Sequence, residues 1–266
     1  MQLYVWIFII IIFLWLCLEN IKNKLYFQPS KGRGPKIVVP HIQDFRLLVN
    51  NKEEIDVLAF RHSNITNNKH FNVKQYVILY CHGNAGNITN RIKIAEIFYD
   101  NGYDMVMFDY RGYGSSDGSP SEKNCYQDAS HVYLWLLENG YQKDQIIVLG
   151  ESIGSGVATY IADKHEIKYL VLKNGFTSIA EVFQNFAWIL QYLCPEFPSY
   201  KNLKSFKQKC PDAKILVYHT IDDNLISIAH GKTLAKKATI SSLSDHGGHN
   251  IHPQCLLPHL KKLLNS

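Results

Sequence analysis

Five continuous apolar runs, each four to six residues long, constrain the fold of this 266-residue chain more than any other feature. They are Tyr76–Cys81, Met105–Asp109, Ile146–Leu149, Tyr169–Leu172 and Ile215–His219. Strands of a parallel sheet that helices cover on both faces read as continuous apolar runs, whereas half-exposed strands alternate. Helical patterns separate these runs, so the sequence predicts a doubly wound α/β sheet.

Three weaker patterns extend this sheet. Phe45–Val49 and Ile55–Phe60 alternate polar and apolar residues, which predicts an antiparallel strand pair. Thr239–Leu243 is expected to form an eighth strand.

One helix of the pattern has clear ends. The segment Ser119-Pro120-Ser121-Glu122 predicts a capping box with Pro120 at the first helical position. The helix is expected to stop at Asn139-Gly140, because glycine ends helices readily.

The N-terminus carries a membrane signal. Leu3–Leu18 contains no charge, and as a helix it would span roughly 24 Å of a hydrocarbon core of roughly 30 Å. A cleaved signal peptide is the alternative, but no basic residue precedes the run and no small-residue cleavage site follows it. We therefore expect an uncleaved anchor over residues 1–18.

Basic residues follow the anchor and set its expected topology. Five of them, against Glu19 alone, favour a cytosolic domain: Lys22, Lys24, Lys31, Arg33 and Lys36. A lumenal domain stays open, since Asn64 and Asn87 begin glycosylation tripeptides. We expect a basic linker at 19–43, a catalytic domain at 44–266 and a lid at about 176–208.

Composition excludes several classes of protein. A net charge of +5 without a basic stripe argues against a nucleic-acid partner. Six cysteines without regular spacing make neither a disulfide scaffold nor a zinc finger.

The segment Gly150-Glu151-Ser152-Ile153-Gly154 follows one of the apolar runs and precedes a helix of small residues. A strand–turn–helix with this GxSxG pattern exposes a strained serine, which makes Ser152 the candidate nucleophile. The alternative is a tight turn with an incidental serine. Acyl transfer also needs two N–H donors for the oxyanion. We expect these from Ile153 and from Asn84, with Ala85 as the next choice for the second donor.

His82 precedes the serine, and we expect it to be structural rather than catalytic. The order serine, acid, histidine places the acid after Ile215–His219 and the base in the glycine-rich loop near the end of the chain. Asp223 is preferred over Asp222, because the apolar Ile226 three residues on can anchor its loop.

The base is expected to be His249, with His246 and His252 as lesser options. The three histidines also suggest a metal site, but the Gly-Gly loop would be a poor clamp and no acidic ligand has regular spacing. No metal is therefore expected.

The segment Ser178–Leu193 predicts an amphipathic helix in the lid. Phe183, Phe186 and Leu190 lie on its apolar stripe and would bind an acyl chain. A helix packed on the core explains the same stripe equally well.

Several loops together resemble the α/β-hydrolase-domain proteins, and more narrowly their membrane-anchored eukaryotic subgroup. The matching segments are HGNAGN (82–87), FDYRGYGSSDG (108–118), GESIGSG (150–156), DDNLIS (222–227) and GGHN (247–250). The resemblance covers about Phe45 to Leu264. It implies the alpha/beta-hydrolase fold, with a mostly parallel eight-stranded sheet flanked by helices, a short lid and an N-terminal membrane helix.

The resemblance also implies a serine hydrolase with a triad of Ser152, Asp223 and His249 and with no cofactor. Asp109, Arg111, Gly112 and Gly114 match a loop that supports the site without reacting. Ser227 departs from the pattern, since many relatives carry proline there.

The expected function is a membrane-anchored serine hydrolase that cleaves acyl esters or thioesters of a lipid or acylated-protein substrate. A peptidase or small-ester hydrolase is one alternative, and a catalytically silent membrane scaffold is the other.

Overall fold

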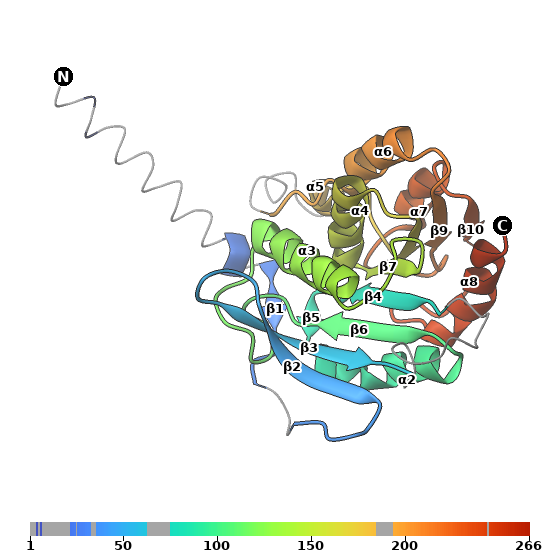
Figure 1. Ribbon diagram of the computed structural model, residues 1–266. Coiled ribbons are helices and arrows are strands. Elements are labelled where there is room, and N and C mark those ends of the chain that lie inside the picture. The colour runs from blue at the N-terminus through green and yellow to red at the C-terminus, as the bar shows by residue number, and fades with distance from the viewer. Residues whose placement is uncertain are drawn as a thin grey trace.

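The computed structural model describes residues 4, 6, 22–24, 26–32, 36–62, 75–184, 194–243 and 245–266. Within this part of the chain, eight strands form one central sheet in the order β10-β9-β8-β7-β4-β6-β3-β2 (Figure 1). The strands are β2 (Ile42–Leu48), β3 (Glu54–Phe60), β4 (Val77–Cys81), β6 (Asp104–Phe108), β7 (Ile146–Glu151), β8 (Tyr169–Lys173), β9 (Lys214–Tyr218) and β10 (Ile240–Ser242). All eight predicted strands are confirmed, with ends that differ by at most three residues.

The direction of the strands matches the expected pattern. β3 runs antiparallel to both β2 and β6, and the remaining pairs are parallel. Parallel neighbours require helical crossovers, which accounts for the alternation of strands and helices along the sequence. The carboxyl ends of β4, β7, β8 and β9 therefore meet at one edge of the sheet.

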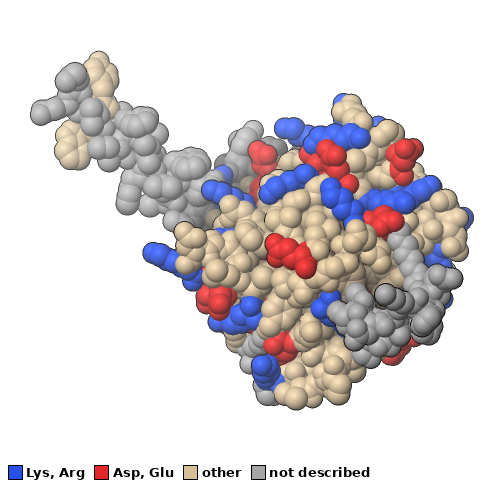
Figure 2. Space-filling view, viewed as in Figure 1, with Lys and Arg blue, Asp and Glu red and all other residues tan. Residues whose placement is uncertain are grey.

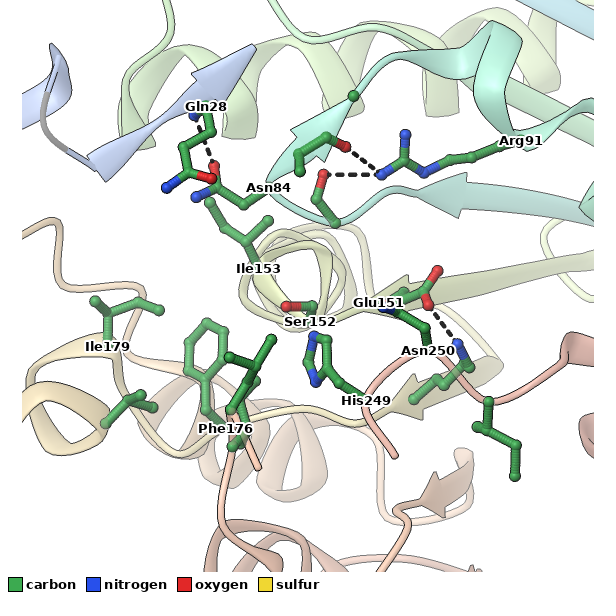
Figure 3. A pocket seen from close by; sticks show the side chains of 18 of the residues that line it. Gln28, Asn84, Arg91, Glu151, Ser152, Ile153, Phe176, Ile179, His249 and Asn250 are labelled. Atoms are coloured by element: carbon green, nitrogen blue, oxygen red, sulfur yellow. Dashed lines mark hydrogen bonds and ion pairs between the residues drawn. The ribbon is translucent and has the colours of Figure 1, made fainter. Parts of the chain in front are cut away.

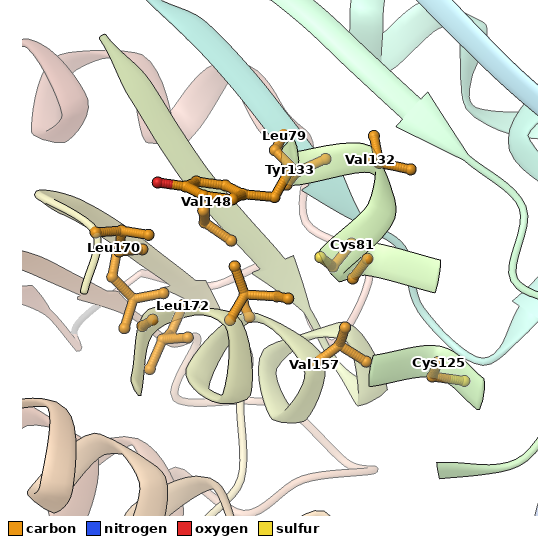
Figure 4. Close-up of a cluster of buried hydrophobic side chains, with 14 of the residues drawn as sticks. Leu79, Cys81, Cys125, Val132, Tyr133, Val148, Val157, Leu170 and Leu172 are labelled. Atoms are coloured by element: carbon orange, nitrogen blue, oxygen red, sulfur yellow. The ribbon is translucent and has the colours of Figure 1, made fainter. Parts of the chain in front are cut away.

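Helices cover both faces of the sheet. They are α2 (Ile92–Asp100), α3 (Glu122–Glu138), α4 (Ile153–His165), α5 (Ile179–Gln184), α6 (Ser199–Lys209), α7 (Ile228–Ala235) and α8 (Leu257–Leu264), with short 3-10 turns η1 (Ile88–Arg91) and η3 (Pro253–Leu256). Alternate residues of β7 divide between two cores: Val148 packs with α3 and α4, while Ile147 and Leu149 pack with α2 and α8. Figure 4 shows the first core, with Leu79, Val148 and Leu172 of the sheet near Val132 and Val157.

The N-terminus of α3 differs from the prediction. Ser121, not Ser119, is the cap: it has extended backbone angles, and its hydroxyl accepts a hydrogen bond from the Asn124 amide at 3.1 Å. Pro120 lies before the helix because it packs on Gly112, where a Cβ would come within 2.5 Å of the proline ring. The predicted end is confirmed, since Asn139 is the C-cap and Gly140 has φ +92°.

The predicted anchor at residues 1–18 lies outside the described residues, apart from Tyr4 and Trp6. Among the helices that are described, none has the length and apolar character needed to cross a bilayer.

Residues 26–32, which we call the strap, fall in the predicted linker but pack on the domain. Their two-residue strand β1 (Gln28–Pro29) pairs in parallel with β5 (Ala85–Gly86). Phe27 is only 4% exposed and belongs to the core around α3 and α4.

The predicted lid contains two described helices. α5 comes first, while α6 packs against α4 through the buried side chains of Leu203 and Phe206. Phe186 and Leu190 lie outside the described residues. On the face seen in Figure 2, basic and acidic side chains are interspersed over the domain.

Candidate active site

Ser152 lies at the turn between β7 and α4 in a strained conformation. Its φ of +55° and ψ of −123° fall in a region that non-glycine residues rarely adopt. The turn is possible because Gly154 lies directly against β4, where a Cβ would come within 1.9 Å of the Cys81 carbonyl oxygen. The sequence therefore folds locally into the predicted elbow, and Ser152 lines a cavity (Figure 3).

His249 reaches the same cavity from the loop after β10. Its Nδ1 lies 2.8 Å from Oδ2 of Asp223, while Oδ1 of Asp223 accepts hydrogen bonds of 2.9 Å from the Leu225 and Ile226 amides. Burial opposes ionisation of Asp223. The hydrogen bond from His249 and those from the two amides outweigh it, so the pKa of this carboxyl is lowered. In Figure 3 the His249 ring lies beside Ser152.

The other candidate acid and bases lie apart from this pair. Asp222 accepts hydrogen bonds from the Gly247 and Gly248 amides, and its carboxylate lies 3.7 Å from Nδ1 of His246. The side chain of His246 is 73% exposed. His252 is exposed and does not line the cavity. Of the candidate bases, then, only His249 lines the cavity, and its close partner is Asp223.

Asn84 and Ile153 both line the cavity, as the expected oxyanion donors should. The carboxamide of Asn84 is engaged elsewhere: its Nδ2 donates to the Tyr26 carbonyl at 2.8 Å, and its Oδ1 accepts from the Tyr113 hydroxyl at 2.8 Å. The Gln28 amide also donates to this oxygen, at 3.3 Å. Any role of Asn84 as a donor to substrate therefore belongs to its backbone amide.

His82 is fully buried and does not line the cavity. Its Nδ1 lies 2.7 Å from the Gly83 carbonyl oxygen, and burial lowers the pKa of its ring well below the usual value. This environment fits the structural role expected for it.

The loop after β6 supports the one after β4. Oδ1 of Asp109 accepts a hydrogen bond of 2.9 Å from the Ile88 amide. Gly114, at φ +51°, lies so close that a Cβ would come within 2.2 Å of Oδ2 of Asp109. Arg111 is buried and pairs with Asp128 at 2.7 Å. These contacts agree with a supporting role for the loop.

The cavity has a volume of about 720 Å³ and two chemically different sides. Apolar side chains line the side next to α5: Tyr26, Phe176, Ile179, Val182 and Phe183. The polar and charged residues of the lining are Asn90, Arg91, Glu151, Lys173 and Asn250, and the apolar Ile94, Ile251 and Pro253 also line the cavity. Figure 3 shows Phe176 and Ile179 on one side of Ser152, and Glu151 and Arg91 on the other. Phe183 lines this cavity and also packs against the core, so it fits both explanations of its apolar stripe.

Sequence reasoning missed the charged residues of this cavity. Lys173 pairs with Glu151, which also accepts a hydrogen bond from the Tyr80 hydroxyl. Burial opposes ionisation of Glu151, but the charge of Lys173 outweighs it and lowers the pKa of the carboxyl. A signal was present, because both residues end apolar runs that the fold places on neighbouring strands, with Glu151 in register with Lys173.

Arg91 was missed as well. Its guanidinium donates to the carbonyl oxygens of Asn87 at 2.8 Å and of Ala85 at 2.5 Å, and so braces the loop after β4. Among the described residues, no three His, Cys, Asp or Glu side chains are grouped as metal ligands.

Sequence comparison relates the chain to hydrolases. It is 32% identical over 202 residues to the lysophosphatidylserine lipase ABHD12 of Danio rerio, which covers 67% of this chain and 51% of that protein. An uncharacterised protein of Mycobacterium tuberculosis is 29% identical, over 74% of this chain and 68% of its own length. The chain thus spans about half the length of the lipase.

Structural comparison shows the same fold. An alpha-beta hydrolase of Vibrio vulnificus superposes with a TM-score of 0.67 at 20% identity, covering 85% of this chain and 81% of that one. The Pyrococcus furiosus esterase Pf2001 superposes with a TM-score of 0.65 at 15% identity, covering 90% and 97%. The model of the alpha/beta hydrolase fold family matches residues 76–209, just over half of the chain. The chain therefore belongs to the alpha/beta hydrolase family, as its loops predict, and its relatives include α/β-hydrolase-domain proteins of vertebrates.

Proposed function

We propose that this protein is a membrane-anchored serine hydrolase that cleaves the acyl ester of a single-chain lipid. The observation that carries the proposal is one cavity holding a strained Ser152 beside His249, whose Nδ1 lies 2.8 Å from Asp223. A strained serine is costly to fold, and a catalytically silent scaffold has no need of one.

In the proposed reaction His249 accepts the hydroxyl proton of Ser152 as Oγ attacks the acyl carbonyl. Asp223 holds the imidazole tautomer and stabilises the imidazolium. The backbone amides of Ile153 and Asn84 donate to the oxyanion, and the N-terminus of α4 favours its negative charge. His249 then gives the proton to the leaving alcohol, and water releases the acid from the acyl-enzyme.

The two sides of the cavity support an amphiphilic substrate. An acyl chain fits the apolar side along α5, with Phe183 as the described member of the predicted stripe. A polar head group fits the charged side, where Arg91 and Lys173 outnumber Glu151. With Ser152 between the two sides, the ester bond that joins chain and head group lies at the nucleophile. The lysophosphatidylserine lipases among the relatives carry a substrate of this kind in their name.

The apolar run Leu3–Leu18 supports the anchor. A domain held at the bilayer meets lipids at high effective concentration. The basic flank favours the cytosolic side, and glycosylation at Asn64 in cells would instead place the domain in the lumen.

The test uses the full chain in detergent micelles, with Ser152→Ala as its matched control. We expect a fluorophosphonate probe to label the natural chain and not the variant, and lysophosphatidylserine to release fatty acid only with the natural chain. A palmitoyl-thioester peptide and a short p-nitrophenyl ester serve as competing substrates. Preference for the short ester would favour the small-ester alternative. Absence of labelling in folded protein would favour the scaffold.

A further inference from the structure

We propose that the strap, residues 26–32, is a positioning element of the active site that holds the oxyanion loop Gly83–Gly86 in its working shape. The inference rests on the proposed function. It assigns a role in the site to residues that the sequence places in a linker, outside every loop that resembles the family.

The strap contacts the loop through backbone and side chain together. Gln28 and Pro29 pair with Ala85 and Gly86, and the Ser30 amide donates to the Gly86 carbonyl at 3.2 Å. The Tyr26 carbonyl accepts from the Asn84 carboxamide, and the Gln28 amide donates to it. The carboxamide of Asn84 is thus held from two sides by one short segment.

The strap is itself fixed to the domain at both ends. Phe27 packs edge-on against Tyr113 and Phe197 in the core. At the other end, Gly32 donates its amide to the Gly114 carbonyl at 2.9 Å, and its own carbonyl accepts from Nδ2 of Asn87 at 3.1 Å. A segment with these attachments can impose a shape on the loop between them.

The loop needs such support, because it is short and flanked by glycines. Gly86 has φ +80°, and glycine restricts the backbone less than any other residue. An oxyanion donor is effective only when its N–H is aimed before the reaction begins. Gripping the Asn84 carboxamide fixes the residue whose backbone amide is the proposed donor.

The strap also forms part of the cavity wall. Tyr26 lines the cavity and packs edge-on against Phe183 of α5, with ring centroids 6.2 Å apart. One segment therefore contacts the oxyanion loop on one side and the proposed acyl-chain wall on the other.

The test compares two changes at one position in the full chain. Gln28→Pro removes the N–H that donates to Asn84, whereas Gln28→Ala keeps it and removes only the side chain. With a soluble short ester, we expect Gln28→Pro to lower kcat by about 10- to 100-fold, with KM and the pH profile close to those of the natural chain. The loss in Gln28→Ala should be roughly tenfold smaller, because the amide donor remains.

A double-mutant cycle separates positioning from general damage. Asn84→Ala removes the carboxamide that the strap holds and keeps the backbone amide, so it should lower kcat to a similar extent. Combined with Gln28→Pro, it should cause less further loss than an independent change would, because both changes remove the hydrogen bond between the Gln28 amide and Asn84. Thermal unfolding of each variant monitors folding.

Two results would overturn the proposal: a kcat of Gln28→Pro within twofold of the natural chain, or losses that multiply in the double variant. If the natural chain itself shows no turnover, the proposed function fails instead. Amide hydrogen exchange over residues 83–87 then still tests the strap, since Gln28→Pro should speed exchange there and Gln28→Ala should not.

Discussion

At the scale of single residues, two adjacent aspartates show how the chain separates one role from another. Asp223 is 8% exposed and is held by the amides of Leu225 and Ile226. Asp222 is exposed and supports the backbone before His249 through Gly247 and Gly248. The same chemical group therefore contacts the His249 ring at one position and is exposed to solvent at the next.

Substitution of these two aspartates gives a matched pair of tests. Asp223→Asn should lower kcat by about 10⁴-fold with little change in fold, because an amide holds the His249 ring in the wrong tautomer. Asp222→Asn makes the same change of side chain at the neighbouring position. We expect it to lower kcat by less than about tenfold, since Asp222 holds the loop and does not contact the imidazole. Steady-state hydrolysis of a short ester measures both. Similar losses in the two variants would contradict the assignment of Asp223.

The residues that could be predicted from sequence are those with a local signature. Asp223 follows from the apolar Ile226 beside it, which is indeed buried and donates its amide to the carboxylate. Lys173 ends an apolar run, but its partner Glu151 lies on a neighbouring strand, so only the register of the two strands pairs them. Arg91 contacts backbone carbonyls, which leave no mark in the sequence. The strap was missed for a related reason: its strand has two residues, which is too short for any periodicity to appear.

At the scale of elements, the strands were predictable because burial on both faces leaves a continuous apolar run. The ends of helices were harder to predict than the strands, because a tertiary contact can move them. Pro120 begins no helix in this structure, since its ring packs on Gly112. The cap passes to Ser121 as a result.

The corrected cap can be tested with two serines of the same segment. Ser121→Ala should lower the free energy of unfolding by about 1 kcal/mol, because the Asn124 amide loses its acceptor. The backbone carbonyl oxygen of Ser119 accepts a hydrogen bond from the Asn124 side chain, and alanine keeps this acceptor. Ser119→Ala should therefore change stability by less than about 0.5 kcal/mol. Urea unfolding measures both, and a larger effect at Ser119 would restore the original prediction.

The packing of α4 on β4 can be tested through its glycines. Gly154→Ala would place a Cβ 1.9 Å from the Cys81 carbonyl oxygen, so the helix must shift away from the sheet. We expect a loss of 3 kcal/mol or more, roughly the cost of severe overpacking, together with loss of probe labelling at Ser152. Gly102→Ala is the control: it meets no atom within 4 Å and strains only the backbone at φ +87°, which costs about 1 kcal/mol. Comparable unfolding midpoints would contradict the close approach.

At the scale of the whole molecule, burial of histidines couples stability to pH. Burial is the main cause that lowers the pKa of His82, His165, His219 and His230. They lie after β4, at the end of α4, after β9 and in α7, so they sample most of the domain. In each case the folded protein resists a proton that the unfolded chain accepts.

This difference predicts acid lability with a defined window. The pKa of a histidine is about 6.5 in an unfolded chain, and that of His165 is lowered to about 4 in the fold. Between these values the unfolded state binds more protons, so stability must fall as the pH falls. Asp128 acts in the opposite direction, because burial raises the pKa of its carboxyl to about 6. Among the described residues, this one carboxyl acts against four histidines, so the free energy of unfolding is still expected to fall as the pH falls. Carboxyls with a lowered pKa, such as Asp223, weaken the fold only below about pH 4.

Urea unfolding of the full chain in micelles at pH 7.5, 6 and 4.5 measures this slope. We expect the free energy of unfolding to fall at each step. His165→Gln, which cannot take up a proton, should remove part of the fall, about 1–2 kcal/mol once the half-exposure of His165 is allowed for. His246→Gln is the matched control, because it makes the same change at a ring whose side chain is 73% exposed. A stability that is flat from pH 7.5 to 4.5, or equal slopes in the two variants, would show that these buried rings do not govern the response of the fold to acid.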